Sequence, residues 1–243
     1  MYVFKCELRK NTKYAIVYLD MLGTTAKIQS SDDEFYLNHL HQIYDRVIQM
    51  TSEDSSYPSN MYKKIRVKIF SDNIIFAKEL RKTPINMKED IEILLDFVSM
   101  FICEAVTEHW WLVRGGMTIG EAYIDKDMVW GKGLIRAYEL ENRVANYPRV
   151  IIDKEVYELF SNTNDRYFSI DHSDDSIILE YLNYYNGVIF QGETINNKLN
   201  KSYDKMVNDA RRPDGTYDDK VFQKLQWHKN YINDWLNNKQ GTR

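Results

Sequence analysis

The sequence predicts an α+β fold, with helices on one face of a mainly antiparallel sheet and a helical extension at the C-terminus. Up to about residue 160, the hydrophobic periods follow the order strand, helix, strand, strand, helix, strand, strand, helix, strand. Short apolar runs are separated by turns rich in glycine, asparagine and aspartate, as in hairpins. After residue 160, a strand and turn at 177–188 precede two polar helices within 195–238. We therefore expect a core unit at 1–160 and an extension at 161–243 that packs on it.

Length and composition indicate a globular protein and argue against a membrane span. The 243 residues are 44% hydrophobic and 28% charged, and no apolar run approaches the roughly 18 residues that cross a bilayer. Residues 1–13 lack the apolar centre of a signal peptide, so we expect a cytoplasmic protein whose Cys6 and Cys103 are thiols. The net charge of −4, with lysine and arginine spread along the chain, argues against nucleic-acid binding. The five histidines form no ligand cluster, which argues against zinc.

The first strand ends on a carboxylate. Residues 14–23, YAIVYLDMLG, begin with an apolar run rich in Val, Ile and Tyr, which is typical of a buried strand, and Asp20 stands at its C-terminal end. A lone carboxylate at the end of a core strand costs several kcal/mol unless it is paired or bound to a cation. An Asp after a strand is also a common helix N-cap, so its position alone leaves both interpretations open.

A second carboxylate follows in residues 65–77, IRVKIFSDNIIFA. Two strand-like runs flank Ser71-Asp72-Asn73, which predicts a hairpin with Asp72 at its tip, although Asp-Asn is also common in ordinary turns. Two carboxylates from neighbouring strand ends form an oxygen-lined pocket that suits Mg²⁺ or Mn²⁺. Together, Asp20 and Asp72 indicate a two-metal phosphoryl-transfer site.

The turn after the first strand is a candidate phosphate-binding segment. Gly23-Thr24-Thr25 leads into a helix, whose first backbone N–H groups would lie next to Asp20 and could hold phosphate oxygens; a simple strand-to-helix turn explains these residues equally well. On the second strand, Lys68 shares a face with Asp72 but lies about 13 Å from it, too far for an ion pair. Lys68 is therefore either a solvated lysine or a residue of a neighbouring subunit's site.

The remaining elements follow from periodicity and turn residues. Helices are expected at 40–47, 91–105 and 131–146, a polar loop at 51–60, and a strand at 149–153 followed by a short helix to 160. Glycines interrupt the strand-like run at 110–124, WWLVRGGMTIGEAYI, which indicates bulges or close backbone approach at a subunit seam or beside a nucleotide. Arg114 in this run could bind a phosphate or a carboxylate. An arginine on a strand is equally often a structural residue that is packed or ion-paired.

Four motifs in this order resemble those of the class III nucleotidyl cyclase catalytic domain over residues 14–153. YLDMLGTT resembles that family's strand-Asp-x-x-Gly-x-Thr metal segment, and RVKIFSD resembles its Lys-x-x-x-Asp segment. RGGMTIG resembles the R-x-G-x-x-x-G strand pair, and VWGKGLIRAYELE resembles the W-G-x-x-V-N-x-A-x-R helix. The combination of SDN, RGGMTIG, AYELE and YPRV is most similar to the compact cyclases of bacterial antiphage Pycsar systems, which make cyclic pyrimidine nucleotides from UTP or CTP.

The resemblance implies a class III cyclase-like (ferredoxin-like) fold. It also implies an enzyme that converts a pyrimidine nucleoside triphosphate, with UTP slightly favoured over CTP, to the 3′,5′-cyclic mononucleotide and pyrophosphate. It also implies a homodimer with composite sites, manganese or magnesium dependence with two ions per site, and a separate effector that senses the cyclic product in antiphage defence. A partner subunit would also cover the free face of the sheet. The implied site residues are Asp20, Asp72 and the main-chain carbonyl of Met21 for the metal ions, Leu22, Gly23, Thr24 and Thr25 for phosphate, and Lys68 for the base.

Three positions depart from the family pattern. Its transition-state Asn falls on Ile135 and its Arg on Glu139, and Met128 stands where a second purine-selecting residue is usual. Arg136, on the same helix, is then the candidate charge stabiliser. The alternatives that stay open are an adenylate or guanylate cyclase, a cyclase-like domain that binds nucleotide without turnover, and a ferredoxin-like interaction or RNA-binding module.

Overall fold

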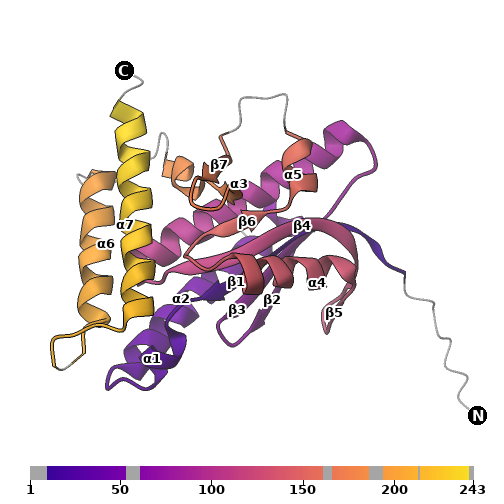
Figure 1. Cartoon of the computed structure of the whole chain (residues 1–243). Coiled ribbons are helices and arrows are strands. Elements are labelled where there is room, and N and C mark those ends of the chain that lie inside the picture. Colours follow the sequence, from indigo (N-terminus) through magenta and orange to yellow (C-terminus); the bar gives the residue numbers. More distant parts are fainter. Residues whose placement is uncertain (1–9, 53–60, 161–165, 186–193, 213, 241–243) are drawn as a thin grey trace, which may run out of the picture.

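The computed structural model describes residues 10–52, 61–160, 166–185, 194–212 and 214–240, and shows one central sheet flanked by helices (Figure 1). The order of strands in the sheet is β2-β3-β1-β4-β6-β8-β7, with the short β5 paired to β4. All pairs are antiparallel except β4 with β6. The expected α+β class with a mainly antiparallel sheet is therefore confirmed. Cys6 and most of the expected loop at 51–60 lie outside the described residues.

The elements have the following bounds. The strands are β1 Thr12–Met21, β2 Ile65–Phe70, β3 Asn73–Glu79, β4 Val113–Ile124, β5 Val129–Trp130, β6 Val150–Ile152, β7 Phe168–Asp171 and β8 Ser176–Leu179. The helices are α1 Thr24–Ile28, α2 Asp33–Thr51, α3 Pro84–His109, α4 Lys132–Glu139, α5 Lys154–Glu158, α6 Ile195–Asp209 and α7 Asp219–Gln240. Three shorter helical segments are η1 Tyr62–Lys64, η2 Leu140–Val144 and η3 Tyr181–Tyr185.

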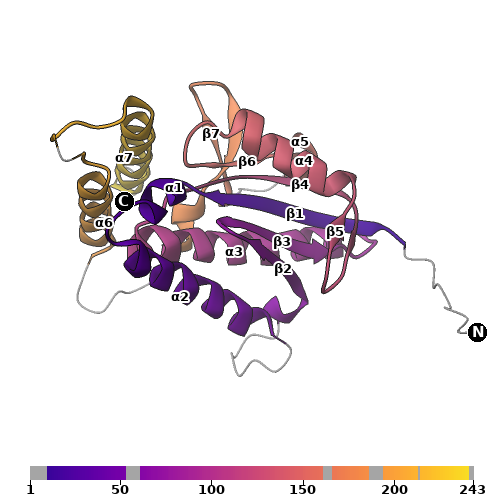
Figure 2. The same cartoon turned by 90° about the horizontal axis from the view of Figure 1, so that it is seen from below.

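The central strand β1 is buried on both faces of the sheet. Ala15, Val17 and Leu19 pack into the main core beneath α2 and α3, whereas Ile16 belongs to a second core cluster with Ala137 of α4. Side chains alternate between the two faces of a strand, so Asp20 lies on the α4 face. Figure 2 shows the sheet between α4 on one side and α2 and α3 on the other. The sequence patterns did not predict this position of α4.

Glycines of β4 allow α4 to approach the sheet closely. A Cβ on Gly116 would lie 2.4 Å from the Cβ of Leu140 and 2.5 Å from the carbonyl oxygen of Ala137, and a Cβ on Gly120 would lie 2.5 Å from the Cα of Gly133. The close approach expected from the glycines in this run is therefore made to a helix of the same chain. β4 itself runs unbroken through them.

The C-terminal extension continues the core. β8 pairs with β6, so the β7–β8 hairpin belongs to the central sheet, and α6 and α7 stand together at one end of it (Figure 1). Tail residues in the main core are Leu199, Met206, Leu225, Ile232 and Trp235. Among the described residues, no helix is both long enough and apolar enough to cross a bilayer.

Candidate active site

The structure brings the two predicted carboxylates to neighbouring strand ends. Asp20, at the end of β1, stands opposite Asn73, the first residue of β3, and the Met21 amide donates a hydrogen bond to the Asp72 carbonyl oxygen at 3.0 Å. Burial raises the pKa of Tyr44, and the charges of Asp72 and Asp20 raise it further. The end of β1 with Asp20 and the turn with Asp72 are therefore neighbours in the fold.

The turn that carries Asp72 is held from two sides. Ser71 has a left-handed backbone with φ of 57°, and its carbonyl oxygen accepts a hydrogen bond from the Tyr44 hydroxyl at 3.1 Å. The side-chain amide of Asn73 donates to Asp72 Oδ1 at 3.1 Å. Tyr44 is buried on α2, so the helix fixes the position of the turn and hence of its carboxylate.

The two carboxylates suit a divalent cation whose remaining ligands come from a substrate. Mg²⁺ is usually bound by one or two carboxylates together with phosphate oxygens, and Asp20 and Asp72 supply two carboxylates on adjacent strands. Within the described part of the chain, no cluster of three or more His, Cys, Asp or Glu side chains could hold a metal ion. A purely protein-built cage is therefore not present among those residues, whereas a site shared with a phosphorylated substrate fits them.

The turn between β1 and α1 makes internal hydrogen bonds. The Met21 carbonyl accepts the Thr24 hydroxyl at 2.8 Å, and the Leu22 amide donates to the Leu112 carbonyl at 2.8 Å. Gly23 has φ of 84°, a left-handed conformation that glycine adopts without strain. Gly23 and Thr25 are exposed. Of the predicted phosphate-binding groups, the Thr24 hydroxyl and the Leu22 amide are thus already engaged.

Arg114 joins the site from β4. It stands opposite Asp20 in the sheet, and its Nε donates to Asp20 Oδ2 at 2.9 Å. Glu141 Oε1 lies 2.7 Å from the same nitrogen and is buried without a hydrogen bond in the described structure. Nε carries a single hydrogen, and it points to Asp20. Glu141 therefore forms an ion pair with Arg114 but accepts no hydrogen bond from its Nε.

Burial explains the unusual ionisation of the residues around Arg114. Burial, opposed by Arg114 and assisted by Asp20, raises the pKa of Glu141 to about 7 from the usual 4.5. Burial, then Glu141 and Asp20, raise the pKa of Tyr18 to about 12, so its phenol stays protonated at neutral pH. The site thus holds one carboxyl group that changes its charge near neutrality.

We expect Glu141→Gln to stabilise the protein most at alkaline pH. Because the pKa of Glu141 is higher in the folded chain, the native state binds more protons than the unfolded state between about pH 4.5 and 7, and wild-type stability falls as pH rises through that window. Glu141→Gln has no titrating carboxyl at this position, so its stability does not fall in this way as pH rises. The melting temperatures of both proteins at about pH 5 and about pH 8 test this prediction. An equal difference in melting temperature at the two pH values would contradict the buried, proton-binding carboxyl.

Lys68 and Arg136 are not paired with the two carboxylates. Lys68 stands opposite Ile75, which stands opposite Tyr18, so Lys68 lies on the α4 face about 10 Å from β1. Arg136 forms a two-pronged ion pair with Asp153, at 2.8 and 2.9 Å.

The Arg136 pair is fixed well away from Arg114. The Thr118 hydroxyl also donates to Asp153, at 2.8 Å. Thr118 is four residues along β4 from Arg114, a distance of about 13 Å. Within one chain, Arg136 therefore remains beside Asp153.

Glu141 and Lys224 are site residues that the sequence did not suggest. Glu141 is the last residue of the segment VWGKGLIRAYELE, but the resemblance of that segment to the cyclase helix assigns it no role. Lys224, on α7, lies far along the chain but within the electrostatic influence of both Arg114 and Asp20. Arg114 stood out in the sequence, but its pairing with Asp20 depends on the register between β1 and β4, which the sequence does not reveal.

No protein-family model and no curated protein matches this chain. It is similar to the solved guanylyl cyclase domain of the RhoGC fusion protein from the aquatic fungus Blastocladiella emersonii, with 10% identity and a TM-score of 0.47 over 70% of this chain and 96% of that one. It is also similar to a class III adenylyl cyclase-like ATP-binding protein from Pseudomonas aeruginosa, with 12% identity and a TM-score of 0.48 over 74% of this chain and 41% of that one.

A third similar structure is the guanylate cyclase domain of RhGC from Catenaria anguillulae in complex with GTP. It has 12% identity and a TM-score of 0.43, over 70% of this chain and 96% of that one.

Proposed function

We propose that this chain is a metal-dependent nucleotidyl cyclase that converts a pyrimidine nucleoside triphosphate, UTP slightly favoured over CTP, to the 3′,5′-cyclic mononucleotide and pyrophosphate. The observation that supports the proposal is that the end of β1, which carries Asp20, lies beside the turn that carries Asp72, with Arg114 bound to Asp20. In the reaction, the ribose 3′-oxygen attacks the α-phosphorus. The bond to the β-phosphate breaks, and pyrophosphate leaves while the hydroxyl loses its proton.

The chain's own residues support this chemistry by binding and orientation. Asp20 and Asp72, with the Met21 carbonyl, would hold Mn²⁺ or Mg²⁺, two ions per site. When bound, such ions lower the pKa of the attacking hydroxyl and neutralise phosphate charge. Tyr44 orients the Asp72 turn through its bond to Ser71. The turn at 22–25 lies next to the carboxylates, where backbone N–H groups that are free of internal bonds would contact phosphate.

We further propose that the site is completed by a second copy of the chain. Large apolar side chains are exposed on β2 and α4: Phe70, which shares a strand face with Lys68, is 82% exposed, and Ile135 of α4 is 59% exposed. Exposed apolar groups that gather on one face are typical of an interaction surface. A homodimer formed through this face would bury them and bring Lys68 and Arg136 of one subunit toward the nucleotide of the other.

Pyrimidine preference and biological role rest on the motif resemblance. Lys68 can donate a hydrogen bond to a uracil or cytosine carbonyl. Met128 offers no hydrogen-bonding group for a purine. The cyclic product would then act as a second messenger in antiphage defence, read by a separate effector.

One observation favours a second candidate, a domain that binds nucleotide without turning it over. Ile135 and Glu139 stand where the cyclase motif has its catalytic pair, and Arg136 is engaged by Asp153. The paired Asp20 and Asp72 favour catalysis instead, because a binding module has less need of two metal-binding carboxylates. Asp20 and Asp72 favour a purine cyclase equally, because such an enzyme would differ only in the base that it binds.

The decisive experiment incubates the purified full-length protein with Mn²⁺ and each of the four nucleoside triphosphates separately, and identifies the products by mass. Cyclic UMP, or cyclic CMP, together with pyrophosphate is expected. A cyclic purine as the sole product would reject the pyrimidine assignment and keep the cyclase. Nucleotide binding without any pyrophosphate would establish the second candidate. Light scattering on the same sample should give the mass of two chains, and the mass of one would reject the dimer.

A further inference from the structure

A cavity of about 470 Å³ lies between the β7–β8 hairpin and α7, a volume within the range of small-molecule sites. Its hairpin wall includes Ser169, Asp171, Ile178 and Glu180, and its helix wall runs from Trp227 to Asn238. None of these residues belongs to the candidate active site. β7 is four strands from β1 in the sheet, a separation of about 19 Å. The cavity is therefore a second, separate feature of the molecule.

The register of the hairpin explains its side of the cavity. Ser169 stands opposite Ile178, and Asp171 stands opposite Ser176. Opposed residues lie on the same face of a sheet, and successive side chains of a strand alternate between faces. Glu180 follows Ile178 by two residues and continues the same face. The hairpin thus turns one set of alternating side chains toward α7.

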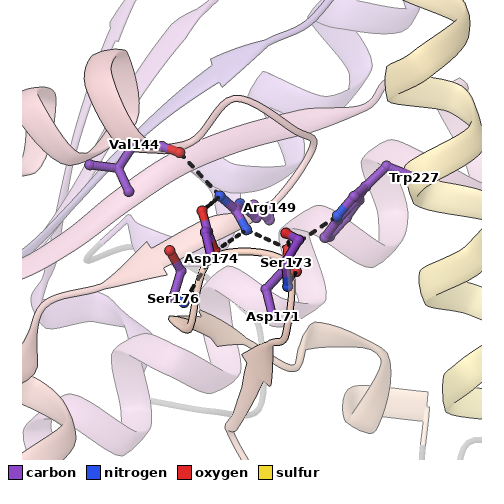
Figure 3. Close-up of polar contacts among 7 residues, drawn as sticks. All are labelled: Val144, Arg149, Asp171, Ser173, Asp174, Ser176 and Trp227. Carbon is purple, nitrogen blue, oxygen red and sulfur yellow. Dashed lines mark hydrogen bonds and ion pairs between the residues drawn. The ribbon is translucent and has the colours of Figure 1, made fainter.

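A buried arginine fixes the walls of the cavity relative to each other. Asp171 and Asp174 of the β7–β8 turn bind Arg149, which donates to the Val144 carbonyl of η2 at 3.2 Å (Figure 3). The indole of Trp227 donates to Asp171 Oδ2 at 3.1 Å. One polar cluster thus joins the hairpin, η2 and α7. Because the walls are already held in place, a ligand would have little ordering of the protein to impose.

Glu180 is a partly buried carboxylate in the cavity wall. Its Oε1 accepts the Tyr231 hydroxyl, and its carboxylate also bonds to the Ser169 side chain. A carboxylate has about four acceptor positions, so these two neutral donors leave part of its capacity unused. Burial raises its pKa against the effect of both bonds, and among the described residues no cation pairs with it. A buried carboxylate is normally paired, so the missing partner indicates a cationic ligand.

The other lining residues also favour a cation. Asp234 follows Tyr231 by three residues and therefore lies on the same side of α7 as the phenol that bonds to Glu180. No lysine or arginine is among the residues that line the cavity, and the basic side chain among them is the exposed His172. The charge of Asp171 is balanced by Arg149. Glu180 and Asp234 therefore give the cavity its negative charge.

The cavity is elongated. Its helix wall from Trp227 to Asn238 covers about 16 Å, and its hairpin wall from Asp171 to the level of Glu180 covers about 13 Å. Ile178 lies between the ends of the hairpin wall and contributes apolar surface there. A long cavity with apolar surface in its middle and acceptors along its walls suits a slender, chain-like ligand.

We propose that this cavity binds a linear polyamine, an alkyl chain that carries several ammonium groups. One ammonium group would donate to Glu180 and supply the counter-charge that this carboxylate lacks, and another would lie beside Asp234. The alkyl chain between them would contact Ile178 and the ring of Tyr231. This inference goes beyond the proposed function and does not depend on it, because the two sites share no residue.

The test measures spermidine binding to the full-length protein by calorimetry, at neutral pH and fixed ionic strength. Glu180→Gln keeps the shape of the side chain and an acceptor for Tyr231, and should weaken binding by about 10- to 100-fold, the range of a lost charge-assisted hydrogen bond. Asp234→Asn, at an exposed position, should weaken binding by about 2- to 5-fold. Thermal unfolding of each variant confirms that it is folded, and if Glu180→Gln unfolds, Asp234→Asn decides.

Asp219→Asn is the matched control, since it removes the same charge from an exposed position on α7 that does not line the cavity. It should bind spermidine like the wild type. An uncharged diol of matching chain length should not bind. The proposal is overturned if the wild type binds no spermidine, or if Asp234→Asn and a folded Glu180→Gln bind it as tightly as the wild type. Equal weakening in Asp219→Asn also overturns it, because the polyamine would then be attracted by the overall charge alone.

Discussion

Asp72→Asn is expected to reduce pyrophosphate release by more than about 100-fold, because it would remove a metal ligand. Substituting a residue that only hydrogen-bonds to a metal ligand already reduces metal affinity or activity by about 10- to 100-fold. Asp72 gives a cleaner test than Asp20, which also holds Arg114 by a 2.9 Å hydrogen bond. The contacts of the Asp72 turn are otherwise kept. The Tyr44 hydroxyl bonds to the Ser71 backbone, and Asn73 can still donate to the amide oxygen of the new side chain. Activity is measured as pyrophosphate released per minute with Mn²⁺ and the preferred nucleotide.

Asp175→Asn is the matched control for this prediction. Asp175 is an exposed turn residue with φ of 56°, a conformation that asparagine adopts readily, and it lies in the β7–β8 turn. It should keep wild-type activity and wild-type melting temperature. If Asp72→Asn releases pyrophosphate at the wild-type rate, the shared-metal interpretation of Asp20 and Asp72 is wrong. Asp20→Asn should lose activity as well, and its melting temperature should also change because Arg114 loses a partner.

Arg149→Met is expected to be the most destabilising of the substitutions considered. Its side chain is 1% exposed and is paired with Asp171 and Asp174. Removing one partner of a buried ion pair leaves uncompensated charge and costs about 3 to 5 kcal/mol. For a chain of this size, that corresponds to a fall in melting temperature of roughly 6 to 20 °C. Differential scanning calorimetry measures it directly.

The control for Arg149→Met is Arg143→Met on η2. The Arg143 side chain is 73% exposed and makes an ion pair with Glu139 at 3.7 Å. An exposed pair of this kind contributes about 0 to 1 kcal/mol, so the variant should melt close to the wild type. Equal melting temperatures for the two variants would show that the buried cluster does not hold the hairpin, η2 and α7 together.

Much of the fold was predictable because local sequence patterns determine its helices, strands and turns. The apolar spacing of Leu40, Ile43, Tyr44 and Val47 predicted α2, and the run before Asp20 predicted β1. The Ser71-Asp72-Asn73 sequence predicted the turn between β2 and β3. In each case the deciding interactions lie within a few residues or follow one hydrophobic face. Such information is present in a single sequence.

The less regular parts were harder to predict. β7 was missed, because Phe168–Asp171 is short and none of its side chains is fully buried. α4 was predicted as a helix, but its place on the second face of the sheet was not. That place depends on how Gly116 and Gly120 fit against α4, which is a contact between distant segments.

The sequence by itself determined that a carboxylate ends the first strand, that a second stands at a hairpin tip, and that both belong to an α+β sheet, because strand periods and turn residues are local properties. Only the tertiary structure decided which groups surround those carboxylates. Arg114 meets Asp20 through the register of β1 and β4, and Glu141 reaches the same arginine from η2. Strand register and helix docking depend on packing across the whole chain, and no local pattern encodes them.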